Sequence, residues 1–180
     1  NNNLPYDEFI TWQIAGDMIP NATKEQILAS GFNRNHKITQ EGGVIPEEYR
    51  VEYVADRTVT TSKIMMGLTV ECARCHTHKY DPITHDEFFS LYSFFNNVEE
   101  NGIIAYGDTA PEPNLTINKK DIENELNFVN LPDSINKVTL MVMKESENLR
   151  KTYVLNRGSY DSPLNEVGPG TPEVVLPFNE

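Results

Sequence analysis

The sequence predicts a mainly α-helical domain over residues 1–100, followed by a smaller β or irregular segment over residues 101–180. In the first hundred residues, apolar side chains recur every three or four positions, as they do along one face of a helix. Capping signals, in which Thr or Pro is followed by Gln or Glu, stand before these stretches. In the last eighty residues glycine and proline are frequent, and apolar residues gather in short runs typical of strands.

The first expected helix begins at Pro5, a residue suited to a first helical turn, and ends at Pro20. Its apolar residues Ile10, Ile14 and Met18 recur every four positions. Phe9 and Trp12 add a second apolar stripe to this helix.

Two further helices are expected before residue 70. Thr23, with Gln26 three residues later, is a typical capping box, and Gly31 is a natural stop for the helix that follows. Pro46, followed by two glutamates, starts a longer helix that we expect to run to about Leu68.

A fourth helix is expected after a second capping box at Thr84 and Glu87. It is apolar on several sides, with Phe88, Phe89, Leu91, Tyr92, Phe94 and Phe95. Such a helix must be buried against something large. The protein core and a flat apolar cofactor both satisfy that requirement.

The second segment reads differently. Residues 118–130 suggest a short polar helix, and residues 138–143 read as a buried strand with residues 152–155 as its partner. From Gly158 onward, the glycine and proline content predicts extended, irregular chain.

Composition excludes several classes of protein. The 180 residues carry 15 Lys and Arg against 27 Asp and Glu, a net charge of −12, so a nucleic-acid partner is not expected. Eight Phe, eight Tyr and one Trp are enough aromatic residues to anchor a core, which argues against disorder. No apolar run approaches the roughly 20 residues of a membrane-spanning helix. The chain starts Asn1-Asn2-Asn3 without Met, so we expect a piece of a longer protein whose leader is not seen.

The chemistry of the sequence concentrates in one motif, in which Cys72 and Cys75 are followed directly by His76. Two cysteines and four histidines placed at random over 180 positions would form it in roughly 2 of 10,000 sequences. The two-residue gap lets both thiols reach the vinyl groups on one edge of a haem, and the histidine then binds the iron. The motif predicts one covalently attached haem c.

Two alternatives stay open at this point. Zinc could be held by Cys72, Cys75 and two of His76, His78 and His85, although zinc modules usually separate their two ligand pairs more widely. A redox dithiol or structural disulfide would favour a βαβ context, whereas the flanks of this motif read as helical.

The first hundred residues resemble the Planctomycete-type cytochrome c domain family. The resemblance is carried by residues 4–9, 13–17, 31–36, 47–53, 56–57 and 72–82. It implies an exported bacterial multidomain protein, located in the periplasm or on the cell surface. Residues 141–145 and 153–158 are similar to the start of the family's companion C-terminal domain. Because that family places a long segment between these blocks, we expect a stretch to be missing before residue 141.

If His76 is the proximal ligand, the opposite side of the iron needs an occupant. His36 lies in a polar loop far along the chain and belongs to the family's Asn-Arg-Asn-His pattern, so it is our first candidate. Met65 or Met66, from the preceding helix, would raise the reduction potential relative to two histidines. The remaining candidates are His78, His85, Met18, Met141 and Met143.

Four arginines are candidate partners for haem propionates, namely Arg34, Arg50, Arg57 and Arg74. For Arg50 and Arg57, we favour pairing with Glu47, Glu52 or Asp56 on their own helix.

The function expected from the sequence is a monohaem c-type cytochrome module for electron transfer. Its partner would be a redox protein, another cytochrome or a larger surface assembly. One alternative is a haem-dependent oxidoreductase with an open distal site. Another is a binding or scaffold component in which haem mainly holds the fold together.

Overall fold

The computed structural model describes residues 3–104, 110–124, 126, 132 and 134–175. Contacts divide the chain into two compact units, each built from two separate stretches. The first unit comprises Asn1–Asn35 and Ala105–Glu145, and the second comprises His36–Ile104 and Ser146–Glu180. Both units contain residues from before and after residue 100. They are therefore not the two domains predicted from the sequence, and the boundary at residue 100 stays a prediction.

The first unit begins with α1 (Tyr6–Ala15), η1 (Gly16–Met18), α2 (Lys24–Ala29) and η2 (Ser30–Arg34). The capping box at Thr23 is confirmed: its hydroxyl accepts the Gln26 N–H, and the Gln26 side chain accepts the Thr23 N–H. The α-helical part of the first helix ends at Ala15, earlier than predicted, and the chain continues as a 3₁₀ turn. A Cβ on Gly16 would stand 2.1 Å from the Gln26 carbonyl oxygen, so glycine permits the close approach of α2.

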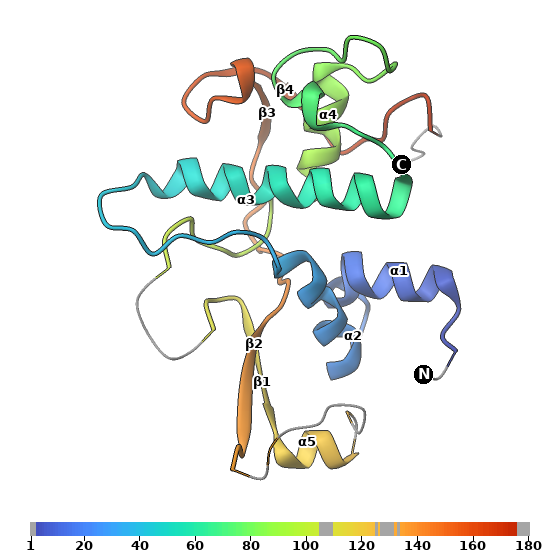
Figure 1. Cartoon of the computed structure of the whole chain (residues 1–180), viewed down its shortest axis with the longest axis vertical. Helices are drawn as coiled ribbons and strands as arrows, with labels where there is room; N and C mark the ends of the chain where they lie inside the picture. Colours follow the sequence, from blue (N-terminus) through green and yellow to red (C-terminus); the bar gives the residue numbers. More distant parts are fainter. Residues whose placement is uncertain (1–2, 105–109, 125, 127–131, 133, 176–180) are drawn as a thin grey trace. The chain divides into compact units, whose positions relative to one another are not determined.

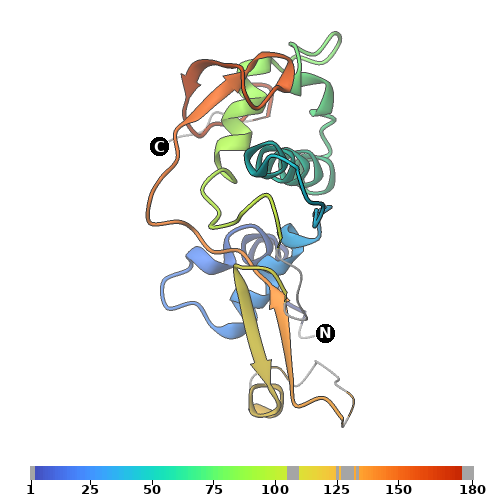
Figure 2. The ribbon, with the colours of Figure 1, turned by 90° about the vertical axis from the view of Figure 1, so that its left-hand side faces the viewer.

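The rest of the first unit is a hairpin of β1 (Asn114–Asn118) and β2 (Lys137–Met141), with α5 (Lys119–Asn124) following β1 directly. The strands are antiparallel, with Thr116 opposite Thr139 and their hydroxyls 3.0 Å apart. Figures 1 and 2 both show α5 at the far end of this hairpin. The predicted polar helix is confirmed over α5, and its residues 125 and 127–130 lie outside the described residues.

The second unit is organised around α3 (Pro46–Thr61), which continues as the π turn η3 (Ser62–Met66). The predicted long helix is therefore confirmed nearly to its expected end. Gly67 has a φ of 68°, the left-handed conformation that commonly closes a helix, and the Leu68 N–H donates to the Ser62 carbonyl at 3.0 Å.

The helix α4 (His85–Ser93) packs on α3 and forms the centre of the second unit's core (Figure 1). Its capping box at Thr84 and Glu87 is confirmed. Phe88 and Phe89 are at most 1% exposed, and Leu91 and Tyr92 are also buried. These aromatic residues thus pack in the protein's own core, as one of the two interpretations proposed, whereas Phe94, just after the helix, is 38% exposed.

A second hairpin, of β3 (Thr152–Leu155) and β4 (Pro163–Val167) joined through η5 (Asn156–Gly158), packs against α4. Strands are confirmed at both predicted positions, but β2 is exposed or half-buried along its length and not buried as predicted. The predicted pairing between them is wrong, because β2 pairs with β1 and β3 with β4. The β3–β4 connection is short, so closing this hairpin costs little chain entropy. β4 was predicted only as extended, irregular chain.

None of the helices within the described ranges combines the length and apolar character needed to cross a membrane.

Candidate functional site

The cysteine motif lies on the 3₁₀ turn η4 (Glu71–Arg74) and the residues directly after it. Val70 and Ala73 are fully buried, and the Ala73 N–H donates to the Val70 carbonyl at 2.9 Å. Cys72 and Cys75 are exposed and are not joined to each other. Side chains three residues apart eclipse each other on a 3₁₀ turn, so the buried pair anchors the turn while the two thiols share its outer side.

The turn is tied to α3 by Arg74. Its guanidinium binds the Glu52 carboxylate with both terminal nitrogens, one of them at 3.0 Å, and reaches the Gly158 carbonyl at 3.4 Å. The hydrogen bond from Arg74 lowers the pKa of Glu52, and the same bond raises the pKa of Arg74. Arg74 is therefore a structural anchor of the motif.

Cys75 has a second tether. Its thiol donates to the Arg157 carbonyl at 3.3 Å, so the η5 connection between β3 and β4 lies against the turn. Arg157 and Gly158 both have positive φ values, of 51° and 73°. A strained connection of this kind is held in place by its surroundings, here the contacts of Cys75 and Arg74.

His76 is exposed directly beyond the two thiols. Its Nδ1 stands 2.8 Å from the Thr77 carbonyl oxygen. A carbonyl can only accept, so Nδ1 carries the hydrogen, and in the neutral ring Nε2 keeps its lone pair. Metal-binding histidines commonly have this arrangement, because the second nitrogen fixes the orientation and tautomer of the ring. His76 therefore fits the role of an iron ligand.

The neighbouring histidines hold the loop around the motif. His78 Nδ1 accepts the backbone N–H groups of Tyr80 at 3.3 Å and of Asp81 at 2.8 Å. His85 Nε2 lies 2.9 Å from the Arg74 carbonyl oxygen, and its ring packs edge-on against Phe89. Among the residues that the structure describes, no three His, Cys, Asp or Glu side chains form a group suited to a metal ion. The zinc set proposed from the sequence is thus not assembled here.

His36 lies in a different setting, a buried cluster with Tyr53, Arg57 and Glu100. Its side chain is 2% exposed, and its ring stacks on Tyr53 with centroids 4.6 Å apart. Nδ1 is 2.7 Å from the Lys37 carbonyl oxygen, and Nε2 faces the Glu100 carboxylate at 3.6 Å. Both ring nitrogens therefore point at protein groups, which does not fit an iron ligand unless the ring leaves this cluster.

Glu100 is held in this cluster by Arg57, whose Nη2 donates to both carboxylate oxygens at 2.9 Å. The prediction that Arg57 pairs along its own helix is wrong, because Glu100 approaches from a different part of the chain. The corresponding prediction for Arg50 is confirmed, since Arg50 binds Glu47 three residues earlier at 2.7 and 2.8 Å. The spacing of three residues along one helix reveals the pair of Arg50 and Glu47. The sequence gives no signal for the pair of Arg57 and Glu100.

The candidate methionines are distributed over both units. Met65 and Met66 are half-buried in η3, and Met18 is 61% exposed. Met143 is buried, and its N–H donates to the Ser30 hydroxyl at 3.0 Å.

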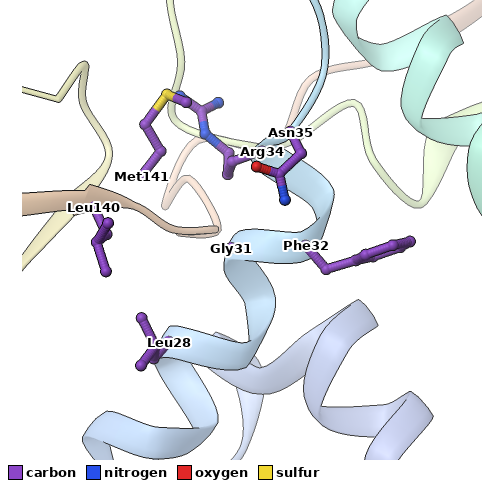
Figure 3. Close-up of a pocket in the computed structure, with 7 residues that line it drawn as sticks. All are labelled: Leu28, Gly31, Phe32, Arg34, Asn35, Leu140 and Met141. Atoms are coloured by element: carbon purple, nitrogen blue, oxygen red, sulfur yellow. The ribbon is translucent and has the colours of Figure 1, made fainter. Parts of the chain in front are cut away.

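Met141 lines a cavity of about 330 Å³ in the first unit. In Figure 3, its sulfur and the Arg34 guanidinium lie together at one end of this cavity, with Leu28 toward the other. Arg34 Nη2 reaches the Met141 sulfur at 3.9 Å and the Glu112 carbonyl at 3.2 Å. A Cβ on Gly31 would stand 2.9 Å from the Met141 carbonyl oxygen, so Gly31 lets β2 approach η2.

The surface beside the motif is hollowed. A cavity of about 500 Å³ lies there, and one of its lining residues, Thr77, directly follows His76 in the sequence. It is lined by Thr77, Pro82, Ile83, Thr84, Glu87, Glu173 and Val174. Its lining combines apolar residues with two glutamates, whereas the core residues of α4 are buried and mostly aromatic or aliphatic.

The exposed Cys-x-x-Cys-His turn places this chain in a general class, helical domains that present two thiols and an imidazole together at the surface. The model of the PSCyt2 family, described as "protein of unknown function (DUF1549)", matches residues 1–100. The chain belongs to this family. No curated protein and no solved structure matches the chain.

Proposed function

We propose that this chain is a monohaem c-type cytochrome module that transfers electrons in an exported bacterial protein. Cys72 and Cys75 would hold the haem through thioethers, and His76 would bind its iron. The haem, when bound, supplies a one-electron redox centre, while the protein sets its potential through ligands, burial and hydrogen bonds.

The observation that carries this proposal is the arrangement of the three motif residues. Both thiols are exposed and unpaired on one turn, and the next residue has its Nδ1 occupied by the Thr77 carbonyl, which leaves Nε2 for iron. The buried residues Val70 and Ala73 fix this turn from beneath. A zinc site would need further ligands close to these residues, and among the described residues no three His, Cys, Asp or Glu side chains form such a group.

The sixth ligand of the iron has three candidates, His36, Met65 and Met66. Ligation by His36 stays a prediction, because its ring would have to give up Tyr53 and the Lys37 carbonyl to reach iron. Met65 and Met66 are half-buried in a π turn, a local irregularity that is frequent at functional sites. We therefore rank the two methionines level with His36.

The engagement of His36 favours a second candidate function. An iron held only by His76 would leave one side for a small ligand such as peroxide, and the module would then be an oxidoreductase. Carbon monoxide distinguishes the two candidates. Rapid binding to the reduced protein supports the oxidoreductase, and the absence of binding supports electron transfer through a six-coordinate iron.

An extracytoplasmic location and a redox partner protein, another cytochrome or a surface assembly belong to the same proposal. In bacteria, haem is attached to such motifs outside the cytoplasm, so production of the holoprotein should require export.

The test is to produce the 180-residue chain behind an export signal in a bacterium that attaches haem to exported cytochromes. We expect haem that stays with the polypeptide under denaturing conditions, and a reduced-minus-oxidised spectrum typical of c-type haem. Cys72→Ser together with Cys75→Ser should abolish attachment. His76→Ala should retain attachment and change the spectrum.

Glu71→Gln is the matched control, because Glu71 is an exposed neighbour on the same turn whose partner is Lys63. This variant should take up haem like the unmodified chain. A colourless protein with two free thiols from the exporting host would overturn the proposal. If the unmodified chain carries haem but the haem-free double serine variant interacts equally well with redox partners, the result would favour the scaffold interpretation.

A further inference from the structure

A cavity of about 280 Å³ in the second unit is built from residues that the proposed haem site does not use. It lies among α3, α4 and the β3–β4 hairpin. Its polar lining consists of Glu47, Arg50, Asn96, Arg150, Lys151 and three tyrosines, Tyr92, Tyr153 and Tyr160.

The charge of this cavity is opposite to that of the chain. The whole protein carries a net charge of −12, whereas the lining holds three cationic side chains and one carboxylate. That carboxylate belongs to Glu47 and is bound by Arg50 through two hydrogen bonds, at 2.7 and 2.8 Å. Arg50 therefore neutralises Glu47, and the charge of Arg150 remains for a ligand.

Arg150 is positioned for such contact. Its Nη1 donates to the carbonyls of Asn96 at 3.1 Å and Val98 at 2.9 Å, which fixes the guanidinium plane. Within the described part of the chain, its Nε and Nη2 have no hydrogen-bond partner. A guanidinium edge with two parallel N–H groups matches the geometry of a carboxylate.

Tyr92 supplies a second donor. The residue is 3% exposed, and its hydroxyl has no hydrogen-bond partner among the described residues. Burial raises the pKa of Tyr92 to about 12, so the hydroxyl keeps its hydrogen at neutral pH. Tyr92 lines the cavity with this hydrogen free to donate, and a bound acceptor would take it.

The rest of the lining defines the body of the ligand. Val51, Leu155 and Pro163 are apolar, and Tyr153 and Tyr160 add aromatic rings. A cavity of about 150 Å³ accepts benzene. A space nearly twice as large accepts a ring that bears a carboxylate.

We propose that this cavity binds a small ring-bearing carboxylate, held by the Arg150 guanidinium and the Tyr92 hydroxyl. Lys151 lies at the exposed rim, where its pair with Glu166 at 2.8 Å is open to solvent and exchanges readily. It serves as an attracting charge rather than an anchor.

The test is calorimetric or NMR titration of the full chain with benzoate at fixed ionic strength, with benzyl alcohol as the neutral analogue and sulfate as the inorganic anion. We expect saturable binding of benzoate below about 10 mM and much weaker binding of the other two. Tyr92→Phe should weaken benzoate binding about fivefold without lowering Tm, because its hydroxyl has no protein partner. Arg150→Gln should weaken it about tenfold or more.

Arg157→Gln is the matched control, since it removes the same charge from an exposed residue outside the cavity and should bind benzoate normally. Equal binding of sulfate and benzoate would overturn the ligand class. Absence of saturable binding, or binding that is unchanged in Tyr92→Phe, would overturn the site. The experiment needs no haem, so its failure is distinct from failure of the proposed cytochrome function.

Discussion

The buried pair of Arg57 and Glu100 gives the sharpest prediction about stability. The two side chains are 1% and 2% exposed, and Arg57 donates to both carboxylate oxygens at 2.9 Å. Glu100→Gln preserves size and removes the buried carboxylate charge that Arg57 binds. Breaking a buried pair from one side costs about 3–5 kcal/mol. We expect the free energy of unfolding to fall by this amount.

The assay is urea unfolding followed by far-ultraviolet circular dichroism, with hydrogen exchange of the α3 amides to assign the change to the second unit. Glu71→Gln is the control, because the same chemical change there breaks only an exposed pair with Lys63, worth about 0–1 kcal/mol. Replacing both members of the buried pair, as Arg57→Met with Glu100→Met, should cost less than Glu100→Gln alone. Equal unfolding free energies for Glu100→Gln and Glu71→Gln would refute the reasoning.

Two further predictions concern the scaffold of the motif. The lowered pKa of Glu52, due first to its hydrogen bond from Arg74, means that this tie stabilises the fold above about pH 4.5 and is lost as the pH falls through the lowered value. The protection factors of the turn amides, which are corrected for the intrinsic pH dependence of hydrogen exchange, should fall over that range, and Glu52→Gln should remove this fall. A Cβ on Gly102 would stand 1.7 Å from the Pro46 carbonyl oxygen, so Gly102→Ala should cost about 3 kcal/mol or more by urea unfolding. Gly42→Ala meets nothing within 4 Å and should be nearly neutral, and similar losses in both variants would contradict the geometry.

The local elements were predictable because their signals are local. The capping boxes at Thr23 and Thr84 each depend on a partner three residues away, and both form as predicted. The motif of Cys72, Cys75 and His76 was equally visible, because its chemistry lies in its spacing along the chain.

The pairing of the strands was not predictable. β1 begins and ends with asparagine and β4 begins with proline, so neither has a strong strand pattern, and the sequence predicts pairing between the two strands that are visible in it. Which strands pair depends on the closure of the whole chain and on the faces that need burial, and neither is encoded in a single segment.

The sequence by itself determined where the helices begin and that two thiols and an imidazole stand together, because these properties arise within a few neighbouring residues. Only the tertiary structure decided that His36 stacks on Tyr53 beside Glu100, that Arg57 binds Glu100, and that the Arg150 guanidinium shares a cavity with Tyr92. These arrangements bring together residues 17 to 64 positions apart. Burial makes the stack and the ion pair favourable, because polar and charged groups removed from water need partners, and the packed chain supplies them from distant segments.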